Sequence, residues 1–214
     1  KLIVYARITD LSDNSTVISS DGIVLYTNAE AVTNGITYTR TSVDDVTARV
    51  NLNGNTVAGI TNGNNSLTAD DYNVSDDGTI TFEASYLQTL AAGNYTLTVS
   101  YNPLGVTYEN RDGNEAPATT SLSLEVVRAQ GSVSNVSDLS KTYDSTPVAA
   151  PTYSVAGTGA VTIEYKERDA ADSTYSTTAP EDAGDYTVRV SVAANEDYAA
   201  ASATRDFTIS RRSV

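Results

Sequence analysis

Apolar and polar residues alternate through most of the chain, and this pattern predicts β-strands. A period of two places successive side chains on opposite faces of a strand, with one face in a core and the other in water. Polar outer faces are typical of antiparallel sandwiches, whereas parallel sheets are covered by helices on both sides. The clearest alternating runs lie at residues 95–101, 121–126, 161–166 and 186–192. A single segment, 83–90, predicts a short turn of helix, with Tyr86, Leu87 and Leu90 on one side.

Turn dipeptides separate these runs. Asn and Asp tolerate a positive φ and Gly adopts it freely, which tight hairpin turns require. The signals are Asp21-Gly22, Asn53-Gly54, Asn62-Gly63, Asp77-Gly78 and Asp112-Gly113. The sequence therefore predicts an all-β protein.

An internal repeat sets the number of domains. The segment 92–99 reads AGNYTLTV and the segment 183–190 reads AGDYTVRV, 91 residues further on. This spacing is close to the size of one small sandwich. A turn glycine followed by a tyrosine early in a late strand is similar to the tyrosine corner of immunoglobulin-like domains, so we expect Tyr95 and Tyr186 to bond back to the chain. We predict two immunoglobulin-like antiparallel β-sandwiches in tandem, covering residues 1–130 and 131–214.

Composition and charge exclude several classes of partner. Lys and Arg number 13 against 27 Asp and Glu, for a net charge of −14. Nucleic acids and anionic lipids require basic residues, so we expect no nucleic-acid partner. No run of about 18 apolar residues is present, so we expect no membrane insertion of these residues. A strongly charged surface also favours a monomer in isolation. The chain begins at Lys1, without Met or a signal peptide, which we interpret as a fragment of a larger protein.

Residues suited to catalysis are scarce. The chain contains no His and no Cys, which excludes Ser-His and Cys-His pairs, disulfides and cysteine metal sites within it. Neighbouring carboxylates could serve a glycosidase, but such neighbours point to opposite faces of a strand or lie in turns. They are Asp44/Asp45, Asp70/Asp71, Asp76/Asp77, Glu181/Asp182 and Glu196/Asp197. We predict no enzymatic activity, no catalytic residues and no cofactor.

Calcium and an isopeptide crosslink are two further alternatives. The group Asp10, Asp13 and Asn14 and the pair Asp70/Asp71 supply oxygen ligands, but neither has the spacing of a calcium loop, so we predict no metal site. A Lys–Asn crosslink requires a buried lysine. Lys141 precedes a turn and Lys166 alternates outward, so we expect no crosslink.

One segment stands out as a candidate ligand-binding loop. Sugar sites use flat aromatic faces with polar groups beside them, and loops on a rigid sandwich often carry recognition. The chain has 14 Tyr and no Trp. Most tyrosines suit core or corner positions, but one lies among polar residues in the long segment 102–117. The candidates are Tyr108, Glu109, Asn110 and Arg111. The alternative is a hairpin edge with Tyr108 packed against the sandwich.

Residues 36–101 contain Asn53-Gly54-Asn55-Thr56-Val57, Asp71-Tyr72-Asn73-Val74 and Ile80-Thr81-Phe82, in that order. Through these and further positions, the first half resembles the X2 module of cellulosomal and other secreted glycoside hydrolases. That family has been linked to polysaccharide and cell-wall binding, but the matching positions are core and turn residues, so no ligand residue carries over. Residues 1–33 are either the first hairpin of this domain, with strands at 2–8 and 23–26, or the end of a preceding module. The matching positions include Asn53-Gly54-Asn55-Thr56-Val57, Ile60, Asn62-Gly63, Leu67, Asp71-Tyr72-Asn73-Val74, Ile80-Thr81-Phe82, Ser85-Tyr86-Leu87 and Ala92-Gly93.

The second half resembles the Ig-like repeats of bacterial surface proteins over residues 139–210. These repeats occur in tandem in adhesin-like and wall-anchored proteins, where many serve as stalk units, so the resemblance implies a location and a spacing role. It rests on Lys141-Thr142-Tyr143-Asp144, Pro151-Thr152-Tyr153, Ile163-Glu164-Tyr165-Lys166, Ala183-Gly184-Asp185-Tyr186, Asp197-Tyr198 and Phe207-Thr208-Ile209.

Two functions follow from these resemblances. The first is a non-catalytic spacer in a secreted or cell-surface bacterial protein, extracellular and attached to the cell wall or surface. The alternative is a carbohydrate- or cell-wall-binding accessory module of a polysaccharide-degrading enzyme, with a polysaccharide or a host or cell-wall ligand as its partner.

Overall fold

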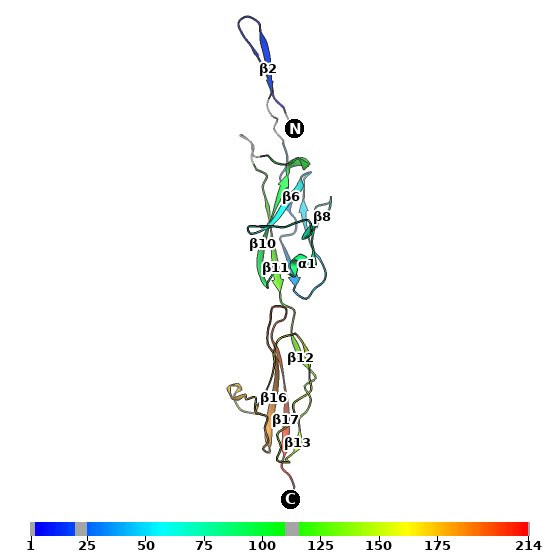
Figure 1. The fold of residues 1–214 in the computed structure, drawn as a ribbon, viewed down its shortest axis with the longest axis vertical. Coiled ribbons are helices and arrows are strands. Elements are labelled where there is room, and N and C mark those ends of the chain that lie inside the picture. The colour runs from blue at the N-terminus through cyan, green and yellow to red at the C-terminus, as the bar shows by residue number, and fades with distance from the viewer. Residues whose placement is uncertain (1–2, 20–24, 110–115, 214) are drawn as a thin grey trace. The chain divides into compact units, whose positions relative to one another are not determined.

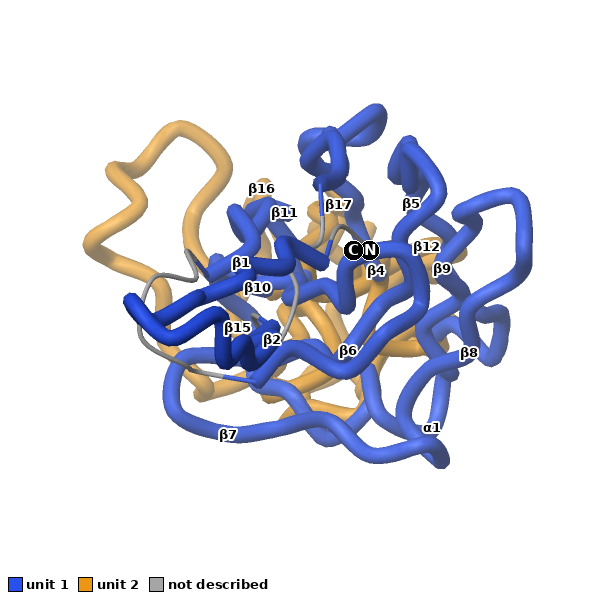
Figure 2. The backbone as a smooth tube through the Cα atoms, turned by 90° about the horizontal axis from the view of Figure 1, so that it is seen from above, with its two compact units in different colours: residues 1–38, 42–126 blue, residues 39–41, 127–214 orange. Residues whose placement is uncertain are grey.

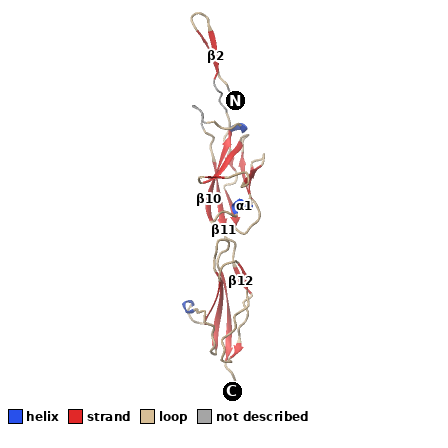
Figure 3. Ribbon diagram, viewed as in Figure 1, coloured by secondary structure: helices blue, strands red, loops and turns tan. Residues whose placement is uncertain are grey.

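The computed structural model describes residues 3–19, 25–109 and 116–213 and contains two compact units (Figures 1 and 2). The first unit comprises Lys1–Tyr38 and Ser42–Val126, and the second comprises Thr39–Thr41 and Val127–Val214. Strands dominate both units (Figure 3). The predicted division at residues 130 and 131 remains a proposal.

An N-terminal hairpin forms a two-stranded sheet of its own, from β1 (Tyr5–Thr9) and β2 (Ser15–Ser19). Ala6 lies opposite Ile18, and Ile8 lies opposite Thr16, so one face of the hairpin is mainly apolar. Every residue of both strands is exposed. Of the two alternatives for residues 1–33, a hairpin between strands 2–8 and 23–26 is not what the structure shows, because β1 pairs with β2 and residues 25 and 26 lie outside any strand. Residues 23 and 24 lie outside the described residues.

The sandwich of the first unit has two facing sheets. The larger sheet has the order β4-β11-β10-β6-β7 and the smaller has the order β3-β5-β9-β8. A short helix, α1 (Ala84–Leu87), follows β9 at the predicted place, and a 3₁₀ turn, η1 (Pro103–Gly105), follows β10. The strands are β3 (Glu30–Ala31), β4 (Gly35–Thr39), β5 (Val46–Asn51), β6 (Thr56–Asn62), β7 (Asn65–Ser66), β8 (Tyr72–Val74), β9 (Thr79–Phe82), β10 (Gly93–Asn102) and β11 (Thr120–Val127).

The alternating side chains of these strands fill the core between the sheets. In β10 and β11 the apolar positions are buried in strict alternation, as the period of two predicts. The fully buried side chains include Tyr38, Ile60, Ile80, Phe82, Leu87, Leu97 and Leu124. At the Asn53-Gly54 turn both φ angles are positive, 50° and 81°, which explains why the sequence places these two residues there.

The second unit has a four-stranded sheet and a smaller two-stranded sheet. The larger sheet has the order β13-β17-β16-β15, and β12 pairs with β14. Phe207 lies in its core, stacked on Tyr186 and edge-on to Tyr165. The strands are β12 (Ser132–Ser134), β13 (Lys141–Thr142), β14 (Ser154–Ala156), β15 (Val161–Glu167), β16 (Gly184–Val192) and β17 (Ala201–Ser210), with the 3₁₀ turn η2 (Asp172–Thr174) after β15.

Both predicted tyrosine corners are present. The Tyr95 hydroxyl donates to the Ala91 carbonyl at 2.9 Å, and the Tyr186 hydroxyl donates to the Asp182 carbonyl at 3.1 Å. Each tyrosine thus bonds to the residue four positions earlier, at the start of the next-to-last strand of its unit. These corners and the sheets confirm the all-β, immunoglobulin-like fold class.

Candidate functional site

The candidate loop begins where β10 ends. Leu104 has a φ of 48° and Gly105 a φ of 73°, so the chain turns sharply in η1. The backbone N–H of Tyr108 then donates to the Asn102 side-chain oxygen at 3.3 Å. Tyr108 is half-buried and Glu109 is exposed. The structure therefore places two of the four predicted residues in one loop, while Asn110 and Arg111 lie outside the described residues.

Asn55 organises this end of the first unit and is buried, with 4% of its surface exposed. Its side-chain amide donates to the carbonyls of Thr27 at 2.6 Å and Leu52 at 2.8 Å. Its side-chain oxygen accepts from the backbone N–H of Leu104 at 3.1 Å. One side chain therefore joins the segment before β3, the β5–β6 turn and the start of the candidate loop. The sequence analysis matched Asn55 only as a turn position and missed this role.

Most tyrosines are buried or half-buried. Among the described residues, Tyr5 in the N-terminal hairpin is the one tyrosine classed as exposed, at 66%. In the second unit, Tyr175 has the Arg189 guanidinium 3.8 Å from its ring centroid. Lys166 Nζ lies 5.2 Å from the same centroid, so this ring is engaged within the unit.

The acidic residues of the first unit act as structural acceptors. The Asp45 carboxylate accepts from the backbone N–H of Ala84 at 2.8 Å, at the start of α1. The Asp71 carboxylate accepts from the Thr68 backbone and hydroxyl. In the hairpin, Asp10 accepts from Ser12 and Asn14 across the turn. Each carboxylate thus closes a turn or begins a helix, as in the Asx motifs of loops.

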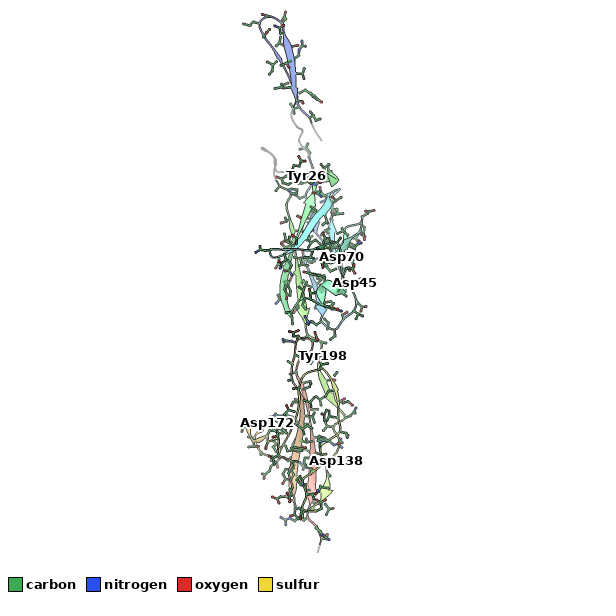
Figure 4. All side chains as sticks on the ribbon, viewed as in Figure 1. Tyr26, Asp45, Asp70, Asp138, Asp172 and Tyr198 are labelled. Carbon is green, nitrogen blue, oxygen red and sulfur yellow. The ribbon has the colours of Figure 1, made fainter. Side chains whose placement is uncertain are left out.

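Other carboxylates lie on separate parts of each unit, although Asp185 and Asp206 both pair with Arg168, at 3.4 and 3.6 Å. Figure 4 shows Asp138 and Asp172 on opposite flanks of the second unit, and Asp45 and Asp70 on the first. In the part of the chain that the structure describes, no three Asp or Glu side chains are grouped closely enough to hold a metal ion.

Both lysines of the second unit, Lys141 and Lys166, make ion pairs. Lys141 Nζ lies 2.5 Å from the Asp144 carboxylate and donates to the Thr146 carbonyl at 2.9 Å. Lys166 Nζ lies 2.9 Å from the Asp172 carboxylate. Lys166 is half-buried where the alternation predicted an outward side chain, because the β15–β16 connection carries Asp172 to it.

The Asp144 carboxyl should titrate in strongly acidic solution. Hydrogen bonds from Lys141 and then Thr146 lower the pKa of Asp144 from 3.8 to about 2. A pKa depressed by folding adds stability above the unfolded pKa, and this stability is lost as the pH falls through the folded pKa. We expect an NMR titration of the Asp144 carboxyl to give a midpoint near pH 2, and the Asp144→Asn variant to lose less stability than the wild type between pH 4 and pH 2. A midpoint near pH 4 would contradict the hydrogen bonds.

A comparison with protein families finds a match for part of this chain. Residues 33–107 match the family model of the carbohydrate binding domain X2. The match runs from just before β4 to the residue before Tyr108 and confirms the resemblance predicted for residues 36–101. The X2 match therefore includes Asn55 and η1, but it ends before Tyr108 and Glu109 and gives those two residues no family support.

Comparison with solved structures gives weak, fold-level likenesses. A tri-modular GH5 (subfamily 4) endo-β-1,4-glucanase from Bacillus licheniformis, complexed with cellotetraose, is 16% identical, with 86% of this chain and 38% of that chain covered and a TM-score of 0.36. The tri-modular endo-β-1,4-glucanase B of Bacillus halodurans is 14% identical over 85% of this chain and 37% of that chain, with a TM-score of 0.36. The titin fragment I67–I69 is 9% identical over 99% of this chain and 74% of that chain, with a TM-score of 0.35.

Likenesses at these identities and TM-scores carry no functional argument for this chain. The chain spans between 36% and 38% of the endoglucanase chains that it matches. No curated protein sequence matches it. The X2 match therefore remains the finding that bears on function, and it suggests a carbohydrate-binding accessory module.

Proposed function

We propose that the two units are non-catalytic spacer modules of a secreted or surface-attached bacterial protein that presents other domains to their targets. The observation that carries this proposal is that side chains suited to binding or catalysis, namely tyrosines, carboxylates and lysines, make hydrogen bonds and ion pairs within the fold. Tyr95 forms a corner and Lys141 and Lys166 make ion pairs. Asp45 accepts a hydrogen bond at the start of α1, and Asp71 closes a turn. Side chains used in this way stabilise the fold, which is what a spacer requires.

An extracellular setting is part of this proposal. A net charge of −14 favours a solvated monomer and disfavours nucleic acid and anionic lipid. Carbohydrate-binding modules of glycoside hydrolases usually work outside the cell. Among the described residues, no helix is long and apolar enough to span a bilayer. Attachment to the cell wall is part of the proposal and would come from other parts of the protein.

Autonomous folding of both units tests the spacer role. We expect residues 1–126 and 127–214, produced separately so that Ala129 stays with its partners Asp197 and Ala199, to unfold cooperatively with free energies close to those of the corresponding transitions of the whole chain. Calorimetry and denaturant titration measure this, and gel filtration should show monomers. Mutual dependence of the two halves, or a dimer that is needed for folding, would count against independent modules in series.

A carbohydrate-binding role of the first unit is the second candidate, and the X2 match favours it. If a polysaccharide binds at the candidate loop, Tyr108→Ala should weaken that binding by about fivefold or more, because truncating a central aromatic contact typically costs over 1 kcal/mol. Tyr5→Ala is the matched control, since Tyr5 is exposed and lies in the separate hairpin sheet. Equal binding by both variants would remove the loop from consideration.

A further inference from the structure

We propose that each sandwich is built to resist tension applied along the chain, because its first segment runs parallel to its last strand and is bonded to it at several levels. This inference rests on the proposed spacer role for its biological use, since a spacer between a surface and a bound target carries the force between them. The mechanical property itself can be measured on this chain.

In the first unit the segment before and within β4 follows the path that leads into β11. The Asn28 side-chain oxygen accepts from the backbone N–H of Ala118 at 3.2 Å. Further along, the Asn34 carbonyl accepts from the N–H of Ser123 at 3.0 Å. Residue numbers rise together from one bond to the next, so the two segments run in the same direction. The β4–β11 pair is therefore parallel, in a sandwich whose other sheet neighbours pair antiparallel.

The second unit repeats this arrangement with different residues. Ala129 forms a parallel bridge with Tyr198, through bonds to the Asp197 carbonyl at 2.8 Å and from the Ala199 N–H at 2.9 Å. Further along the first segment, the Val136 carbonyl accepts from the Arg205 guanidinium of β17 at 3.1 Å.

The end of the same segment is hydrogen-bonded to the C-terminal end of β17. The Thr208 N–H donates to the Ser140 hydroxyl at 3.2 Å, and β13 then pairs in parallel with the end of β17. The Tyr143 N–H donates to the Ser210 carbonyl at 2.8 Å. Bonds between the first segment and the last strand therefore span β17 from the residues before it to its final residue.

Parallel terminal segments respond to tension in shear. When the entering chain is pulled one way and the leaving chain the other, both segments are drawn along their own axes, and the hydrogen bonds between them are loaded together. Strands pulled apart from one end lose their bonds one after another, because each broken bond transfers the load to the next. Forced unfolding is governed by the unfolding rate along the pulled direction, so the same fold can be strong in one direction and weak in another.

The β16–β17 pair provides an internal control, because it can be pulled apart from one end, the direction in which low unfolding force is expected. Gly184 at the start of β16 lies opposite Ile209 at the end of β17, so the strands leave the sheet at the same pole. Handles at Asp182 and Ser213 would open the β16–β17 pair from that end. Both residues are exposed, and the chain has no cysteine, so Asp182→Cys with Ser213→Cys gives two unique attachment points.

Single-molecule force spectroscopy on the full chain compares the two directions. Pulled from its termini, the chain should show two unfolding events, each releasing roughly 300 Å of contour length at about 3.6 Å per residue. Pulled through the two cysteines, the second unit should unfold at roughly half that force or less, since few hydrogen bonds are loaded at once. Chemical denaturation of the double-cysteine variant should match the wild type, which shows that direction rather than stability differs.

Equal or lower forces from the termini would overturn the proposal for tension. That result would leave the spacer role intact, because independent folding and the absence of polysaccharide binding are measured separately. Conversely, saturable polysaccharide binding would displace the spacer role without changing the measured forces.

Discussion

Replacing Phe207 with alanine is expected to lower the free energy of unfolding of the second unit by about 3–5 kcal/mol, the usual cost of removing a buried aromatic ring. Phe207 is 2% exposed. Its ring centroid lies 5.6 Å from that of Tyr186, nearly parallel to it, and 6.4 Å from that of Tyr165, edge-on. Alanine would leave a cavity beside the tyrosine corner, while the first unit should keep its wild-type stability.

Denaturant titration with separate probes for each unit measures both effects. Phe207→Leu is the control that keeps most of the volume, and it should cost less than the alanine variant. A loss under 1 kcal/mol in Phe207→Ala, or an equal loss in both units, would contradict either the packing around Phe207 or the independence of the two cores.

The second large effect is expected at Asn55 in the first unit. Asn55→Ala should lower the free energy of unfolding by about 2–4 kcal/mol, because buried backbone groups that lose a hydrogen-bond partner each cost roughly 1–3 kcal/mol. The groups concerned are the carbonyls of Thr27 and Leu52 and the N–H of Leu104. The loss should also release Leu104, whose φ of 48° is costly for a residue with a side chain.

A local measurement separates this role from general destabilisation. Hydrogen exchange at the Leu104 amide should accelerate in Asn55→Ala more than exchange in the core strand β10. Asn65→Ala, at an exposed position in β7, is the matched control and should change stability by less than about 0.5 kcal/mol. Unchanged exchange at Leu104 would show that Asn55 does not hold the loop.

The features that the sequence predicted well depend on local pattern. Tyr95 and Tyr186 bond only four residues back, and each follows a turn glycine, so the repeated AG(N/D)YT segment was sufficient to find both corners. The burial of alternate residues in β10 and β11 follows from the period of two. The short helix was visible because its apolar residues fall on one side over a single turn.

The features that the sequence did not reveal depend on distant partners. Asn55 bonds to residues 28 and 49 positions away, and its own neighbours identify it only as part of a turn. The parallel pairing of β4 with β11 joins strands at opposite ends of the unit, and no local pattern distinguishes it from antiparallel pairing. The pairing of β1 with β2 was not foreseen, because the turn from Asp10 to Asn14 carries no glycine and so gave no hairpin signal.

The most direct test of the spacer account is a depletion isotherm of the full chain over insoluble polysaccharides, repeated with soluble glycans and with residues 1–126 and 127–214 alone. The account predicts no saturable binding by any of the three proteins, all of them folded. Saturable binding by the full chain and by residues 1–126 would contradict it and make the X2-matched unit a carbohydrate-binding module.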